Sequence, residues 1–559
     1  MRSHMVHTGI IVITLALASA GCVQPGAWDG GSLGQYQRAR VDRAPQPRGS
    51  DALEPYRPAR ETKLPTLEVR TDADTGRRHV RLSLGDAVIH ALAASPEIGV
   101  VAFDPAVSRE EVVQAAAAFD AEVFAEWARR KTDERTDSTA GGGEAEVRSV
   151  QAGLRQKIPT GAEWVLSWAA TDTRDDVITR TLHPRYERKA SLQITQPLLR
   201  NAWPAFNLAQ LRLARVSHRQ TLEAFRETVE EVVAAVHATY WQLVRARGDV
   251  TIQEELIAYT QDTLDRLRAR AELDATSVQI SQTEAALHAR EEALLLAVQK
   301  LADVREQLAR LISHPELPPT APLVIEPTTQ LVTAPVDMDV NDQLLTALHH
   351  SPQLAQARLE IEAADIRVTA AESEALPRLD ITAGATLQGL AGGRHGATED
   401  LGTLDYAGYE LAFTFEYPLG NRQRLANLRA ARRRRHQAVA SFQNAADRLA
   451  VRVRERLRAA ETARRRVSVQ QAAVHSAEVQ LQAIEDTEKV RGALTPEFIL
   501  VKLQAQETLA DARRRVLQAR QDYNVALAEL ARETGTIADF SAVNVALPTG
   551  ESTTRRAPE

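Results

Sequence analysis

The side chains that could perform acid–base, nucleophilic or metal chemistry are few, and their spacing forms no catalytic pattern. The 14 histidines include no pair with the HExxH-like spacing of a zinc enzyme, and His349 and His350 are expected to be solvated on a short helix. The stretch DSTAGGGEAE (137–146) lacks the lysine and the strand–helix context of a phosphate-binding loop. The sequence therefore predicts no enzyme, no cofactor and no metal site.

Cys22 is the only cysteine of the chain, and its surroundings indicate the attachment of lipid. Arg2 and an apolar run over 10–20 describe a secretory signal peptide, and the run is shorter than the ~20 residues of a membrane-spanning helix. The motif SAGC (19–22) resembles the bacterial lipoprotein signal, whose cysteine becomes the lipidated mature N-terminus, although serine stands where leucine is usual. The alternative is an ordinary secretory signal with an incidental cysteine.

Composition favours long helices. Aromatic residues make up only 4% of the chain, while Ala, Leu, Arg, Glu and Gln abound. The net charge of −6 implies no bulk attraction to nucleic acid. The run of arginines at 432–435 is interpreted as a solvated or salt-bridged stretch of helix in preference to an anion-binding site. No long apolar segment follows the signal, so any membrane passage must use strands.

An internal repeat organises the chain. LGDAVIHALAASPEI (84–98) resembles VNDQLLTALHHSPQL (340–354) at an offset of 256 residues, and ITQPLL (194–199) resembles FEYPLG (415–420) at an offset of 221. The first copy thus has about 35 extra residues between these anchors, which we expect to form a flexible loop within 127–190. Each copy is predicted to contain a short helix (83–118 and 339–375), two strands and a long helical hairpin.

A heptad spacing of apolar residues predicts the long helices, and an alternation of apolar and polar residues predicts the strands. Leucines at 287, 294, 301 and 308 are spaced by seven, and no proline occurs between Pro204 and Pro315, so helices of roughly 60 residues and ~90 Å are expected. In YELAFTFEYP (409–418), Tyr and Phe alternate with polar or small residues, as in a barrel strand. Two strands per copy give four per chain, too few to close a barrel without several chains.

This plan resembles the TolC-type outer-membrane efflux family. The likeness is carried by the Ala-Leu and Ser-Pro pairs of the short helices, and by LPRLDITAG (376–384), QPLL (196–199), YPLG (417–420) and VRGALTP (490–496). The resemblance implies a mainly α fold with a small β part, a homotrimer with a shared twelve-stranded barrel, and a helical tunnel across the periplasm. It implies an outer-membrane duct for efflux or type I secretion, with a periplasmic adaptor (membrane fusion) protein and an inner-membrane pump as partners, and no nucleic acid.

The resemblance also implies a role for the two hairpin turns, because in this family the turns form the periplasmic tip of the tunnel. Adaptor contacts are expected there, at Glu272, Leu273, Arg491, Gly492, Ala493, Leu494 and Thr495; plain intrachain packing is the alternative for the two leucines. TolC has gate aspartates at positions that correspond to Phe498 and Val501, so an apolar gate is expected, flanked by Glu497 and Lys502. Packing of Phe498 between helices of one subunit is the alternative.

The signal motif and the internal repeat together divide the chain into six segments. They are a lipoprotein signal peptide (1–21), a Pro-rich lipid-anchored leader (22–78), the first repeat (79–314), a Pro-rich linker (315–338), the second repeat (339–535) and a tail (536–559). Residues 23–66 of the leader are either an extended tether or a strap packed on the body. The alternative function is a coiled-coil adaptor or structural lipoprotein without a pore. Two hairpins and amphipathic strands favour the duct, and nothing in the residues supports a third possibility, an enzyme on a coiled-coil scaffold.

Overall fold

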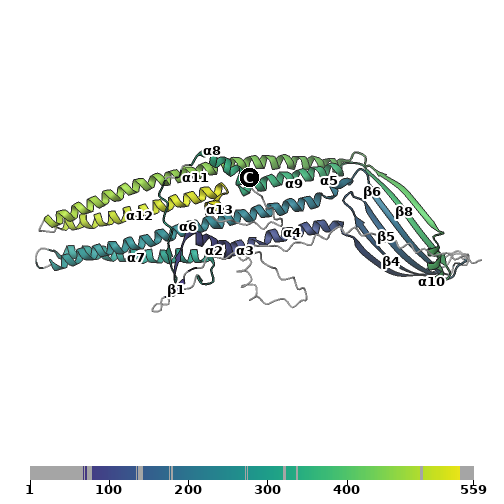
Figure 1. Ribbon diagram of the computed structural model, residues 1–559, viewed down its shortest axis with the longest axis horizontal. Coiled ribbons are helices and arrows are strands. Elements are labelled where there is room, and N and C mark those ends of the chain that lie inside the picture. The colour runs from purple at the N-terminus through teal and green to yellow at the C-terminus, as the bar shows by residue number, and fades with distance from the viewer. Residues whose placement is uncertain are drawn as a thin grey trace, which may run out of the picture. The chain divides into compact units, whose positions relative to one another are not determined.

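The computed structural model describes residues 67, 69–71, 78–133, 135, 143–175, 177, 181–270, 272, 275–318, 323–334, 336, 338–490 and 495–541. Residues 64–545 form one compact unit. Within it, a large sheet lies at one end of the helices and the two hairpin turns lie at the other (Figure 1). The signal peptide, Cys22 and nearly all of the leader lie outside the described residues.

Two helical hairpins form the body, as the heptads predict. The first consists of α6 (Ala209–Ala269, 61 residues) and α7 (Ser277–Ile312, 36 residues), and the second of α11 (Arg422–Val490, 69 residues) and α12 (Pro496–Glu533, 38 residues). The returning helices are shorter than the expected 60 residues. Separate helices accompany the remaining length, because α9 (Pro352–Glu374) packs on α6 and α11, and α4 (Phe103–Ala116) packs on α6.

The short helices repeat with the same break. Ser95 separates α2 (Leu84–Ala94) from α3 (Pro96–Val101), and Ser351 separates α8 (Val340–His350) from α9. In both copies proline begins the next helix, where its missing N–H costs nothing. The helical stretch Leu84–Val101 is long and apolar enough to cross a membrane, judged by length and composition only. The expectation that no long apolar segment follows the signal peptide is therefore corrected. The stretch is broken at Ser95 and buries Ala87, Val88 and Ala91, as a core segment does.

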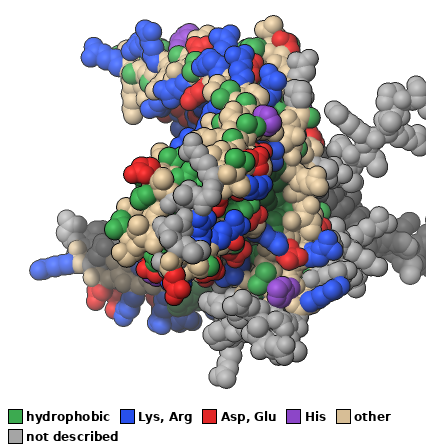
Figure 2. All heavy atoms as spheres, turned by 90° about the vertical axis from the view of Figure 1, so that its left-hand side faces the viewer, with side chains coloured by type: hydrophobic (Ala, Val, Ile, Leu, Met, Phe, Trp, Pro, Cys, Tyr) green, Lys and Arg blue, Asp and Glu red, His purple; other side chains and the backbone are tan. Residues whose placement is uncertain are grey.

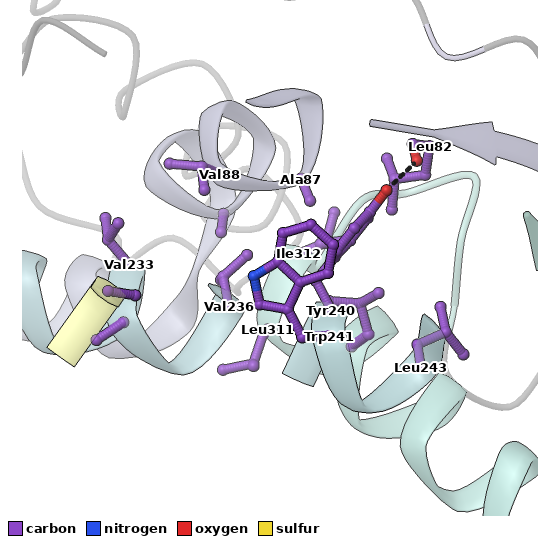
Figure 3. Packing of buried hydrophobic residues seen from close by; sticks show 14 of the residues in the cluster. Leu82, Ala87, Val88, Val233, Val236, Tyr240, Trp241, Leu243, Leu311 and Ile312 are labelled. Atoms are coloured by element: carbon purple, nitrogen blue, oxygen red, sulfur yellow. Dashed lines mark hydrogen bonds between the residues drawn. The ribbon is translucent and has the colours of Figure 1, made fainter. Parts of the chain in front are cut away.

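A small sheet joins the leader and the linker to the helices. It has the order β1 (Val69–Thr71), β2 (Arg78–Leu82) and β7 (Leu323–Pro327). Residues 23–66, expected to be a tether or a strap, lie outside the described residues. Tyr240 of α6 is fully buried, and its hydroxyl donates to the Leu82 carbonyl at 3.0 Å (Figure 3). The same hydroxyl accepts from the Thr329 N–H at 3.0 Å. Tyr523 of α12 binds the linker in the same way, at Ala334 and Val336. The two tyrosines therefore fix the linker to both hairpins.

The large sheet corrects the expected number of strands. It is fully antiparallel with six strands in the order β3-β4-β5-β6-β8-β9, where four strands were expected. The first copy supplies four of them, because part of the segment expected as a flexible loop forms strands. The bounds are β3 Glu122–Asp133, β4 Glu144–Lys157, β5 Glu163–Asp175, β6 Arg185–Pro197, β8 Arg378–Ala391 and β9 Ala407–Glu416.

Short helical segments connect these parts. They are η1 (Ala117–Phe119), α5 (Trp203–Asn207), α10 (Arg394–Thr403) and α13 (Ile537–Phe540). The segments η1 and α5 lie where the chain passes between the large sheet and the helices. The segment α10 packs against β8 and β6 at the end of the sheet away from the long helices. The sheet is therefore continuous in sequence with the helices through η1, α5 and the start of α11.

Candidate functional site

The large sheet has one apolar and one polar face. The apolar face is built by in-register neighbours, such as Leu166 opposite Leu192 and Ala383 opposite Leu411. Its larger members are Trp127, Leu154, Leu166, Trp168, Leu192, Ile194, Leu411, Phe413 and Phe415, and all are exposed. The polar face holds the alternate residues, including Gln193, Glu410 and Thr414. Leu411 and Phe413 are 66% and 64% exposed, and a contiguous apolar surface of this size marks contact with lipid or a partner.

The two outer strands, β3 and β9, each pair with only one neighbour among the described strands. An outer strand presents a row of backbone N–H and C=O groups that water can satisfy and hydrocarbon cannot. β3 runs away from the helices after η1, and β9 runs back into α11, so these two edges are antiparallel to one another. The edges of two copies therefore have the polarity needed to pair.

The hairpin turns end in similar helix caps. Thr276 caps α7, accepting from the Gln279 N–H at 3.3 Å while the Gln279 side chain accepts from the Thr276 N–H at 2.7 Å. Thr495 caps α12 and accepts from the Phe498 N–H at 3.3 Å. Glu272 is exposed in the first turn. The other expected adaptor contacts lie outside the described residues: Leu273, Arg491, Gly492, Ala493 and Leu494.

The expected gate residues on α12 differ in burial. Phe498 is half-buried and packs with Leu267, Ile280 and Leu503 of the same subunit, which is the alternative weighed for it. Val501 is 47% exposed, on one helix stripe with the exposed Glu497. Leu500, which the sequence reasoning did not single out, is 60% exposed beside Val501. Leu500 and Val501 are therefore both exposed apolar residues of α12 near the tip, as are Val490 at the end of α11 and Val278 at the start of α7.

Lys502, expected to flank the gate, instead belongs to a buried ion pair. It is 3% exposed, and its Nζ donates to Glu488 Oε2 of α11 at 2.6 Å. Arg266 of α6 lies 3.8 Å from the other oxygen of Glu488, so this carboxylate connects three helices. Seen from the turn end, Lys and Arg side chains gather over the α11–α12 hairpin (Figure 2). The charge of Lys502 is thus used inside the subunit, away from the surface of the tip.

Arg290 of α7 ties the two hairpins together. It is 6% exposed and donates to the Leu503 carbonyl at 2.9 Å and to Gln506 Oε1 at 3.2 Å, both on α12, and also to Thr260 of α6. Burial lowers the pKa of Arg290, while Glu507 at 3.5 Å opposes this shift. A guanidinium nevertheless stays charged, so separating the hairpins would break several charge-assisted hydrogen bonds at once.

The second copy matches a known family. Residues 344–536 match the model of the family described as "Outer membrane efflux protein", which confirms the resemblance carried by the repeat motifs. No curated protein matches the chain in sequence. The family match covers the short helix, β8, β9 and both helices of the second hairpin.

Solved structures share the fold of the whole body. The outer membrane protein VceC of Vibrio cholerae is 18% identical, with 81% of this chain and 96% of that chain covered and a TM-score of 0.59. The Neisseria gonorrhoeae MtrE outer membrane channel in its open state is 14% identical, covering 81% and 89%, with a TM-score of 0.59. The Campylobacter jejuni CmeC outer membrane channel is 13% identical, covering 81% and 86%, with a TM-score of 0.58. The expected TolC-like protomer of two repeats with long hairpins is therefore confirmed.

Loss of the Arg290 guanidinium is expected to loosen the tip. In Arg290→Met, hydrogen bonds to a buried charged group worth about 2–3 kcal/mol are lost, so amide hydrogen exchange across 495–510 should accelerate about 30-fold or more. Arg513→Met is the matched control, because Arg513 pairs with Glu255 and Glu478 at the surface, where such pairs contribute about 1 kcal/mol or less. Equal exchange in the two variants would contradict the role of Arg290.

Proposed function

We infer that this chain is a TolC-type outer-membrane efflux protein, the channel subunit of a tripartite efflux or type I secretion system. It is a passive export duct through the outer membrane and the periplasm. The observation that carries this proposal is the six-stranded sheet, whose exposed apolar face adjoins open edges and whose strands continue into two long helical hairpins. A non-pore adaptor or structural lipoprotein would not need an apolar sheet with a polar opposite face, so this alternative is not favoured.

The functional unit is proposed to be a homotrimer. Pairing β9 of one subunit with β3 of the next removes every open edge, as a sheet in lipid requires. Three subunits with six strands each give a barrel of eighteen strands, in place of the twelve that four strands per subunit would give. Barrels of 16–18 strands leave an aqueous channel. The polar face, with Glu410 and Thr414, then lines water, and the apolar face meets lipid.

The partners proposed for the channel are a periplasmic adaptor protein and an inner-membrane pump. Energy for export comes from the pump, and the duct itself has neither a catalytic role nor a cofactor. The adaptor is expected to bind the hairpin turns at the exposed Glu272 and Thr495, together with Leu273 and the stretch 491–494. Binding can open the channel only if the adaptor prefers the state with separated hairpins, in which the Arg290 hydrogen bonds are broken.

The gate is proposed to be formed by Val501 of each subunit, with Leu500 beside it and Glu497 at its entrance. A narrow apolar ring excludes ions because they would shed water with nothing to replace it. Phe498 supports this ring from behind, since it packs against Leu267 and Leu503. We also propose the segment boundaries predicted from the sequence, from the signal peptide (1–21) to the tail (536–559).

The two faces of β9 provide a test of membrane insertion. Leu411→Arg places a charge on the lipid face and is expected to cost about 2–4 kcal/mol, whereas Thr414→Arg places it on the water-filled side and should cost much less. The yield of heat-resistant trimer in the outer-membrane fraction measures this difference. Equal loss in both variants would exclude the barrel orientation.

The gate can be tested by conductance. Val501→Asp in the full-length trimer should raise the single-channel conductance in planar bilayers and add cation preference, because three carboxylates would meet at the axis. Val451→Asp is the control, since Val451 is exposed on α11 but far from the turn. The gate assignment fails if Val501→Asp conducts like the unmodified trimer.

The proposed lipid anchor depends on Cys22, which lies outside the described residues. The mature chain should begin at Cys22 with acyl chains attached, and Cys22→Ser should abolish lipid labelling while trimers still insert through their strands. Mass spectrometry of the mature N-terminus measures both. An unmodified Cys22, or a mature chain that starts elsewhere, would rule out the anchor.

A further inference from the structure

A group of arginines replaces the apolar residues at the end of the apolar face farthest from the helices. Arg129 of β3 and Arg148 of β4 stand directly opposite one another, and Arg148 stands opposite Asp172 of β5. Arg188 of β6 lies on the same face, and Arg394 reaches it from the start of α10. These four side chains, Arg129, Arg148, Arg188 and Arg394, are called the arginine cluster below.

The carboxylates within the arginine cluster are too few to neutralise it. Asp172 accepts from Arg188 at 3.1 Å and from Arg394 at 2.7 Å. Glu146 is shared in the same way by Arg129 and Arg148, each at 2.8 Å. Two carboxylates therefore serve four guanidinium groups, and an excess positive charge remains. Like charges directly opposite each other across a strand pair are unfavourable, and Arg129 and Arg148 share the single carboxylate of Glu146.

The arginine cluster borders a cavity with an apolar floor. The cavity has a volume of about 500 Å³ and is lined by the four arginines, Asp172, Trp127, Val150, Trp168 and Ala170. Charged groups thus lie at one end and two indoles at the other. Arg188 is held rigidly, with 8% of its side chain exposed, whereas Arg129, Arg148 and Arg394 are 53%, 41% and 65% exposed and can reach a ligand.

The position of the cavity relative to the membrane rests on the proposed function. If the helices occupy the periplasm, the α10 end of the sheet lies at the outer surface of the outer membrane (Figure 1). Aromatic residues are enriched at that interface, and arginines on the lipid face cost little there, roughly 0–1 kcal/mol. Trp127 and Trp168 then mark the border of the hydrocarbon, with the arginine cluster at the level of the headgroups.

We propose that the arginine cluster is a binding site for the phosphorylated headgroup of an outer-leaflet lipid, whose acyl chains lie along Trp127 and Trp168. Guanidinium groups bind phosphate through paired N–H donors, which suits Arg129 and Arg148 facing one another across β3 and β4. An amphipathic anion matches both ends of the cavity, whereas a free phosphate ion would leave the indole floor without a partner. The site lies largely on β3, β4 and β5, and the alternation in the sequence indicates only β5 of these three.

Native mass spectrometry of the full-length trimer tests the proposal. The probes are lipid A with both phosphates, dephosphorylated lipid A, phosphatidylcholine and inorganic phosphate. Lipid A should bind at least tenfold more tightly than its dephosphorylated form, and millimolar inorganic phosphate should not displace it. The double variant Arg129→Gln/Arg148→Gln should lose this preference about tenfold or more. Arg155→Gln on the opposite, polar face of β4 should keep it, because Arg155 pairs with Glu122 away from the cavity.

The possible results distinguish failure of the lipid site from failure of the proposed channel function. If the unmodified trimer conducts in bilayers but binds lipid A no better than dephosphorylated lipid A, the arginine cluster is a self-contained ion-pair network and the proposal is wrong. Displacement by inorganic phosphate would likewise overturn the choice of a lipid. Failure of the unmodified trimer to insert or conduct would instead contradict the outer-membrane channel itself.

Discussion

The structure depends on one constraint, which is that a sheet exposed to lipid can have no open edge. The apolar face of the large sheet cannot remain in water, and its outer strands β3 and β9 cannot remain unpaired in hydrocarbon. The two demands are met together only when copies of the chain join edge to edge. Because β9 leads directly into α11, and β6 into α5 and α6, closing the barrel also arranges the helices in a ring. In the proposed trimer, the tunnel would thus be a consequence of the sheet.

Within a subunit, the two hairpins are joined by a small number of polar contacts between long apolar seams. Tyr240 and Tyr523 fix the linker near the middle of the helices, and Arg290 and the Lys502–Glu488 pair connect the helices toward the turns. Buried ionic contacts contribute little net stability but are costly to break singly. This distribution fixes the middle of the helices, while a few buried polar contacts hold the hairpins together toward the turns. In the proposed assembly, an adaptor bound at the turns would act on these contacts.

Sequence reasoning reached the elements whose pattern is long or regular. Heptads gave the hairpins, the repeated Ser-Pro break gave the short helices, and alternation of Tyr and Phe gave β9. It missed the full complement of strands because Arg129 and Arg148 occupy positions on the apolar face, which hides the alternation that identifies a strand. The gate shows a second limit: Phe498 and Val501 are three residues apart on one helix, and only the packing of α12 on α6 decides which of them faces outward. Lys502 likewise reads as a surface charge until its partner on α11 is known.

The number of strands has a geometric consequence for where passage is controlled. With strands about 4.8 Å apart and tilted by ~40°, eighteen strands close a barrel roughly 36 Å across between backbones, whereas twelve give about 24 Å. The helical part gains nothing from the additional strands, because each subunit still contributes two hairpins. In the proposed trimer, the membrane portion would therefore be the wide end of the duct and would offer little resistance to a solute. In the proposed trimer, selection by size is expected at the turns, where Leu500 and Val501 are exposed and where the contacts of Arg290 oppose separation of the hairpins.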